Sequence, residues 1–130
     1  MNLDVPKVII DKYNIELFIL YGSYAEGKNK PGSDLDLAFK SSTNLKQQTE
    51  IELLNELSNF YQRGDIDLVN VNKADPVLKV EIAKNGKLLY GSQEDFDRFS
   101  IYAAAIYADT KFLRDDRREM LEKKLEVRNK

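Results

Sequence analysis

The stretch that decides the fold spans positions 17 to 39 and reads LFILYGSYAEGKNKPGSDLDLAF. It opens with Leu17–Tyr21, a compact apolar run ended by Gly22, which is typical of a strand buried on both faces. It closes with Asp34–Phe39, where polar and apolar residues alternate with the period of a strand. Because side chains at i and i+2 of a strand share a face, Asp34 and Asp36 are expected to project together.

Two neighbouring carboxylates repel each other unless they share bound cations. Two Mg²⁺ ions about 3.5 to 4 Å apart are a recurrent device for in-line phosphoryl displacement, and Mn²⁺ can take their place. The best candidate for a third carboxylate is Asp67, which lies between Ile66 and Leu68 in a later alternating run, with Asp65 on the same face nearer the strand start. Lys28, Lys30 and Lys40 lie around the site and could either steer phosphate or simply be solvated. Gly22 lets the backbone turn sharply after the first strand, and Ser23 with nearby amides could hold phosphate oxygens at a helix start.

On either side of this stretch, the chain shows alternating helix and strand patterns. The elements expected are a helix over 5–13, a helix over 44–61, a strand over 65–71, a helix from Asp75 to near Gly86, an edge strand over 88–90 and a long helix from Ser92. The apolar stripe expected on the helix over 44–61 comprises Ile51, Leu54, Leu57 and Tyr61, widened by Leu53 and Phe60, and the stripe expected on the long helix comprises Phe99, Tyr102, Ile106 and Leu113. This order predicts an α/β (α+β) layered fold, with a small mixed sheet packed by helices. We expect one domain over residues 1–130, with a core at about 1–91 and a C-terminal helical extension at about 92–130.

Composition excludes several kinds of chemistry. The 130 residues include 20 Lys+Arg, 22 Asp+Glu, no His and no Cys, so neither a Cys or His nucleophile nor the usual zinc site is available. A metal would be held by oxygen, which favours hard cations. The net charge of −2 argues against direct nucleic-acid binding. The longest apolar run, Ile101–Ala108, is too short for a membrane helix, and we expect a cytosolic (cytoplasmic) protein.

A competing motif overlaps the turn. The residues from Gly22 to Lys28 match Gly-x4-Gly-Lys, the phosphate loop, but Asn29 stands where a Ser or Thr should ligate Mg²⁺. That loop also requires a helix running on from its lysine. Pro31 and Gly32 would break such a helix within a turn, so the phosphate-loop interpretation is disfavoured.

The combination of a Gly-Ser turn, an Asp-x-Asp strand and a later strand aspartate resembles a known family. The residues that carry the resemblance are Tyr21-Gly22-Ser23-Tyr24-Ala25, Gly27, Ser33-Asp34-Leu35-Asp36-Leu37 and Asp67. They are similar to the minimal nucleotidyltransferase domain of the DNA polymerase β superfamily, and within it to the MntA antitoxins paired with HEPN-domain toxins. The motif match covers about residues 17 to 71. The resemblance implies the nucleotidyltransferase fold, with a long C-terminal helix.

The resemblance further implies an enzyme that transfers AMP from ATP to a tyrosine hydroxyl of a cognate HEPN ribonuclease toxin and so silences it. Carried over by position, Gly22 and Ser23 would bind the nucleotide phosphates. Asp34 and Asp36 would ligate both Mg²⁺ ions, and Asp67 would complete the metal site beside the acceptor hydroxyl. One departure stands out: the family commonly has Arg where this chain has Glu26, whose negative charge disfavours ATP.

Two other functions remain open at this point. One is a non-catalytic antitoxin that masks its toxin by contact alone. Clustered carboxylates disfavour it, since a steric inhibitor has no need of charges that repel. The other is adenylylation of a small molecule such as an aminoglycoside, which the apparent lack of a second domain for the acceptor disfavours.

Overall fold

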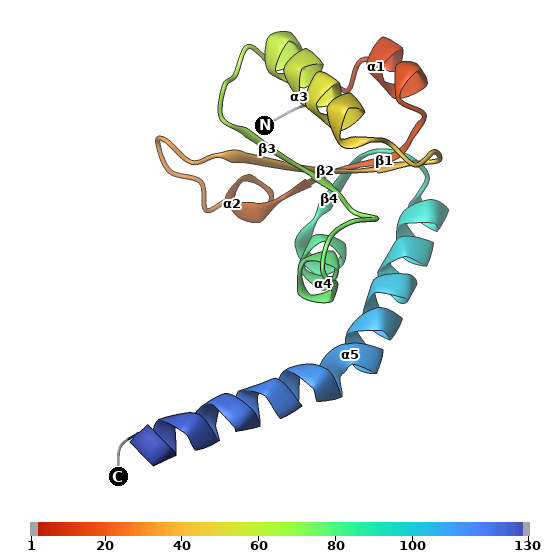
Figure 1. The fold of residues 1–130 in the computed structure, drawn as a ribbon. Coiled ribbons are helices and arrows are strands. Elements are labelled where there is room, and N and C mark those ends of the chain that lie inside the picture. The colour runs from red at the N-terminus through yellow and green to blue at the C-terminus, as the bar shows by residue number, and fades with distance from the viewer. Residues whose placement is uncertain (1–2, 129–130) are drawn as a thin grey trace.

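A four-stranded sheet with helices on both of its faces makes up the body of the protein (Figure 1). The structure is a computed structural model and describes residues 3–128. Its elements are α1 (Lys7–Lys12), β1 (Ile15–Tyr21), α2 (Gly22–Ala25), β2 (Leu35–Ser41), α3 (Gln47–Tyr61), β3 (Ile66–Asn70), α4 (Pro76–Asn85), β4 (Lys87–Tyr90) and α5 (Gln93–Arg128). All the expected elements are present with shifted ends, and the helix start expected at Ser23 is the four-residue helix α2.

The sheet is mixed, as the sequence predicts. Its strand order is β3-β2-β1-β4, in which β1 pairs antiparallel with both β2 and β4, while β2 and β3 run parallel. All but one residue of β1 are buried, which is why this central strand reads as an apolar run without alternation. The expected edge position of β4 is confirmed.

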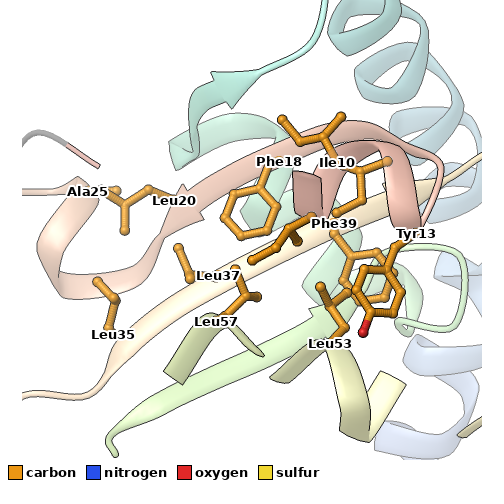
Figure 2. Close-up of a cluster of buried hydrophobic side chains, with 12 residues drawn as sticks. Ile10, Tyr13, Phe18, Leu20, Ala25, Leu35, Leu37, Phe39, Leu53 and Leu57 are labelled. Atoms are coloured by element: carbon orange, nitrogen blue, oxygen red, sulfur yellow. The ribbon is translucent and has the colours of Figure 1, made fainter. Parts of the chain in front are cut away.

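One face of the sheet packs against α1 and α3 (Figures 1 and 2). Leu35, Leu37 and Phe39 alternate along β2 and point to this face, where they meet Leu53 and Leu57 of α3. The expected stripe on this helix is therefore partly wrong. Ile51 and Phe60 belong to that stripe, but they are 44% and 51% exposed because the helix is rotated so that Leu53 and Leu57 face the sheet.

The opposite face packs against α4 and the first part of α5. The buried side chains here are Leu17, Ile19, Tyr21, Ala38, Val71, Ile82, Phe99 and Ala103. Tyr102 and Leu113 were expected to share an apolar stripe with Phe99, yet they are 57% and 56% exposed. Tyr102 lies between the buried Phe99 and Ala103 but is turned towards solvent. Leu113 lies on the distal part of α5, which leaves the sheet and passes below α4 (Figure 1).

Helix α5 bends near its middle (Figure 1). Thr110 Oγ1 donates to the carbonyl of Ile106 at 2.9 Å, and Arg114 reaches back to the carbonyl of Tyr107 at 2.8 Å. Side chains that bond to helix carbonyls in this way are a recognised cause of helix bending. Despite its 36 residues, α5 is not apolar enough to cross a lipid bilayer, and neither is any other helix within residues 3–128.

Candidate active site

Three side chains form a row across the sheet where β1 ends. In the strand register, Tyr21 of β1 pairs with Asp36 of β2, and Asp36 pairs in turn with Asp67 of β3. Residues paired in register lie on one face of a sheet, so the carboxylates of Asp36 and Asp67 project side by side. Asp34 precedes β2 by one residue and is exposed. The sequence prediction that two strands bring Asp36 and Asp67 together agrees with this register.

The turn after β1 lies directly against this row. Gly22 has φ +71°, a left-handed conformation that residues with a side chain rarely adopt. A Cβ placed on Gly22 would overlap the Oδ2 atom of Asp36. Glycine is therefore required at position 22 for two reasons. It adopts the left-handed turn, and it lets the backbone approach the Asp36 carboxylate. Ser23 follows in the first turn of α2 and is half-buried.

The site concentrates negative charge. Partial burial raises the pKa of Asp36, and the nearby carboxylates of Asp67, Asp34 and Glu81 raise it further. Burial also raises the pKa of Tyr21, with the same neighbours Asp67, Asp36 and Glu81 contributing. Both shifts mean that additional negative charge is disfavoured at this place, which is the property expected of a site that receives a cation.

The carboxylates suit a metal that is shared with a nucleotide. Within residues 3–128, no three acidic side chains are arranged to hold a metal ion on their own. Among residues 3–124, whose side chains the structure describes, no Lys or Arg forms an ion pair with Asp34, Asp36 or Asp67. Mg²⁺ in nucleotide-dependent enzymes is commonly held by one or two carboxylates together with substrate phosphates. Unpaired carboxylates beside a glycine turn fit that donor set.

Two charged residues that the sequence places near the site are engaged elsewhere. Asp65 was expected on the face of Asp67, but its carboxylate pairs with the guanidinium of Arg63, which lowers the pKa of Asp65. Lys40 lies near the far end of β2 and pairs with Glu16. Neither side chain can serve as a free ligand or phosphate contact as placed.

Sequence reasoning missed Glu81 as a neighbour of the site. It belongs to α4, which packs on the same face of the sheet as Asp36. Its negative charge contributes to raising the pKa of both Asp36 and Tyr21. In the sequence Glu81 is simply one acid between Val80 and Ile82 of a helix. No local pattern identifies it, because its position depends on how α4 docks.

A groove lies away from the carboxylates, between the start of α4 and the distal part of α5. Its volume is about 550 Å³, and its lining includes Val77, Leu113 and Leu121 together with Arg114, Arg117 and Arg118. Figure 1 shows the distal part of α5 passing below α4, which is the arrangement that creates the groove. The apolar floor and basic rim suit a protein partner better than a phosphate.

Comparison with known proteins identifies relatives of this chain. The model of the family described as Polymerase beta, Nucleotidyltransferase matches residues 5–95. The protein adenylyltransferase MntA of Shewanella oneidensis is 31% identical over 93 residues, an alignment that covers 72% of this chain. The same alignment covers 66% of MntA, just under two thirds of its length.

Solved structures give the same result for the fold. A toxin–antitoxin structure with AMP-PNP contains a chain that is 26% identical, with a TM-score of 0.75 and coverage of 92% of this chain and 94% of that chain. A complex of a tri-AMPylated Shewanella oneidensis HEPN toxin with its MNT antitoxin gives a TM-score of 0.69 at 24% identity, covering 92% of each chain. The latter likeness concerns the fold alone. Both alignments extend beyond the residues matched by the family model.

Proposed function

Since the chain belongs to the polymerase β nucleotidyltransferase family, we propose that it is an antitoxin that transfers AMP from ATP to a tyrosine hydroxyl of a HEPN ribonuclease toxin. Its relative MntA is a protein adenylyltransferase, which supports AMP transfer as the reaction. The AMP-PNP in a similar toxin–antitoxin structure supports ATP as the nucleotide. In this proposal the modified toxin is inactive, and the protein works in the cytosol.

The observation that carries the proposal is the contact between turn and carboxylate. The backbone at Gly22 lies against Asp36, and Asp67 stands next to Asp36 in the strand register. A phosphate held by Ser23 and the turn amides would therefore lie beside the two carboxylates. This arrangement supports the proposal that a phosphate binder and metal ligands act on one phosphorus atom, as in-line phosphoryl transfer requires.

The proposed reaction exchanges one phosphorus–oxygen bond for another. The tyrosine oxygen of the toxin forms a bond to the α-phosphorus of ATP, while the bond from that phosphorus to the bridging oxygen breaks. Pyrophosphate leaves with the bonding electrons. Asp67 is exposed at the sheet edge and is the carboxylate best placed to receive the proton of the incoming hydroxyl. Gly22 and Ser23 orient the phosphates during this exchange.

The metal ligands in this proposal are Asp34, Asp36 and Asp67. When bound, two Mg²⁺ ions, or Mn²⁺ in their place, would neutralise the charge that develops on the attacking and leaving oxygens. Without such cations, the acidic row would repel a triphosphate, the more so because Glu26 is exposed at the end of α2. The protein is therefore expected to bind ATP only together with a divalent cation.

The exposed part of α5 supports the proposal that the acceptor of AMP is a protein. Phe112, Leu113, Met120 and Leu121 are each more than half exposed, and large exposed apolar side chains gathered on one segment mark interaction surfaces. We propose that the toxin docks here, along the groove between α4 and α5. A toxin bound to this helix would bring its own tyrosine to the carboxylates, so that the acceptor pocket is completed by the partner.

The same docking surface would also serve an antitoxin that only masks its toxin, so the test must separate binding from transfer. The wild type and an Asp34→Asn, Asp36→Asn double variant are each co-expressed with the cognate HEPN toxin. We expect both to co-purify with the toxin and only the wild type to restore growth, because neutral amides ligate Mg²⁺ less well than carboxylates. Restoration of growth by the double variant would leave masking as the function.

A further inference from the structure

The loop between α3 and β3 contains a guanidinium that is bonded on two sides. Arg63 donates to both carboxylate oxygens of Asp65, at 2.8 and 2.7 Å. It also donates to the hydroxyl of Tyr24 at 3.0 Å, and its Cζ lies 5.2 Å from the centre of the Tyr24 ring. The side chains of Arg63 and Asp65 are 24% and 36% exposed, so the pair is partly shielded from water.

Both partners of Arg63 are attached to the candidate active site. Tyr24 lies in α2, immediately after Ser23. We call residues 22–28 the phosphate turn. Asp65 accepts a backbone hydrogen bond from the amide of Leu35 at 2.9 Å, and Leu35 separates Asp34 from Asp36. One guanidinium therefore connects the turn that would hold the phosphates to the strand start that carries the carboxylates. The connection spans 39 residues of sequence.

The phosphate turn needs such a connection because it holds itself weakly. Helix α2 has four residues, and two backbone hydrogen bonds close the turn, from Glu26 N to Gly22 O and from Lys28 N to Ser23 O. A single helical turn is unstable alone, since its few bonds do not offset the loss of backbone entropy. Residues 26–32, which follow α2, are all exposed. The position of Ser23 therefore depends on the contacts of Tyr24 and Ala25 with the body.

We propose that Arg63 is a positioning residue for the AMP transfer. Through Tyr24 and Asp65 it holds the phosphate turn in place against the carboxylates of Asp36 and Asp67. This inference rests on the proposed function for its catalytic consequence. Arg63 acts without touching the nucleotide. Its guanidinium matters because it donates from two separate nitrogens to Asp65 and Tyr24, whereas a lysine ammonium carries its three donors on a single atom. The proposal also gives Asp65 a role other than metal ligand.

The test compares two conservative variants with a matched control. Tyr24→Phe keeps the ring and loses the hydroxyl, while Arg63→Lys keeps the charge and loses the fork. The control is Lys12→Met, which breaks the exposed Lys12–Glu56 ion pair of 2.7 Å between α1 and α3. Melting temperature, affinity for AMP-PNP with Mg²⁺, and kcat and KM for AMP transfer to the toxin are measured for each protein and for the Tyr24→Phe, Arg63→Lys double variant.

We expect each site variant to lower kcat for transfer by about tenfold or more, because misplacement of a reacting group by a fraction of an ångström has effects of this size. AMP-PNP affinity should fall by less, about threefold, and the melting temperature should change no more than in the control. The double variant should be no worse than the worse single variant, since both break one connection. Full multiplication of the two effects, or wild-type transfer in either variant, would overturn the proposal.

A readout that needs no catalysis separates this proposal from the proposed function. Amide hydrogen exchange of residues 22–28 should be about tenfold faster in Tyr24→Phe and Arg63→Lys than in Lys12→Met, because the turn opens more often when the connection is lost. If the wild type transfers no AMP, the proposed function fails, while faster exchange still supports the connection. Unchanged exchange in both site variants rejects the connection whatever the activity.

Discussion

Gly22 and Gly27 allow a sharp test of the contact between turn and carboxylate. Both have nearly the same left-handed backbone, with φ +71° and +70°. A Cβ at Gly22 would overlap Oδ2 of Asp36, whereas a Cβ at Gly27 would meet nothing within 4 Å. Alanine at either position therefore costs the same backbone strain, and only Gly22→Ala also displaces a proposed metal ligand.

The magnitudes follow from this difference. The left-handed conformation costs an alanine about 1–2 kcal/mol, of which the smaller entropy of the unfolded alanine chain returns part, so we expect Gly27→Ala to lose about 1 kcal/mol. Gly22→Ala should lose about 1–3 kcal/mol more, the usual cost of forcing an extra methyl group into a packed place. Because displacement of a catalytic group by about 1 Å can cost 10²-fold in rate, AMP transfer should fall by about that factor in Gly22→Ala only.

The assay combines urea unfolding of both variants with AMP transfer to the toxin under saturating ATP and Mg²⁺. Gly27→Ala should transfer AMP within about threefold of the wild type, as is usual for a change at an open surface position. Equal losses of stability and equal activities in the two alanine variants would contradict this prediction. In that case the approach of Gly22 to Asp36 would have no bearing on the reaction.

Three further predictions concern charge. In EDTA, the Asp36→Asn variant should melt at a higher temperature than the wild type, because the substitution removes a carboxylate whose charge is disfavoured by burial and by Asp67. The variant should also lose the stabilisation that Mg²⁺ gives the wild type. Glu26→Arg should tighten ATP binding about three- to tenfold at low salt, measured by calorimetry, with a smaller gain at high salt. Equal ATP affinities of variant and wild type would show that the charge at position 26 does not affect phosphate binding. Burial raises the pKa of Tyr61 from 10.0 to about 12, so its stabilising contribution is complete below pH 10 and is lost as the pH rises through about 12. Tyr61→Phe should therefore show a smaller fall in melting temperature over that range, and an equal fall would contradict this assignment.

Features carried by local pattern could be predicted from the sequence. The apolar run of β1, the alternation in β2 and the glycine after β1 predict the mixed sheet, the turn and the neighbouring aspartates. The strand period also predicts that Asp36 and Asp67 share a face once their strands pair. The strand periods and the glycine turn depend on residues close in sequence, so they can be predicted without knowledge of the tertiary structure.

Features set by docking could not be predicted. Glu81 reaches the site only because α4 packs on that face of the sheet. Arg63 meets Tyr24 across 39 residues, and nothing in either neighbourhood indicates the pair. Likewise the periodicity of α5 suggests a continuous apolar stripe, whereas the bend at Thr110 and the course of the helix leave Leu113 exposed. In each case tertiary packing, rather than local propensity, decides which side chains meet.

The central claim is that this chain moves AMP onto a partner, and the intact mass of that partner tests it most directly. The cognate HEPN toxin is incubated with the wild-type protein, ATP and Mg²⁺, beside a parallel sample containing the Asp34→Asn, Asp36→Asn double variant. We expect a toxin that carries one or more AMP units in the first sample and none in the second. A toxin of unchanged mass after incubation with the wild type would contradict it.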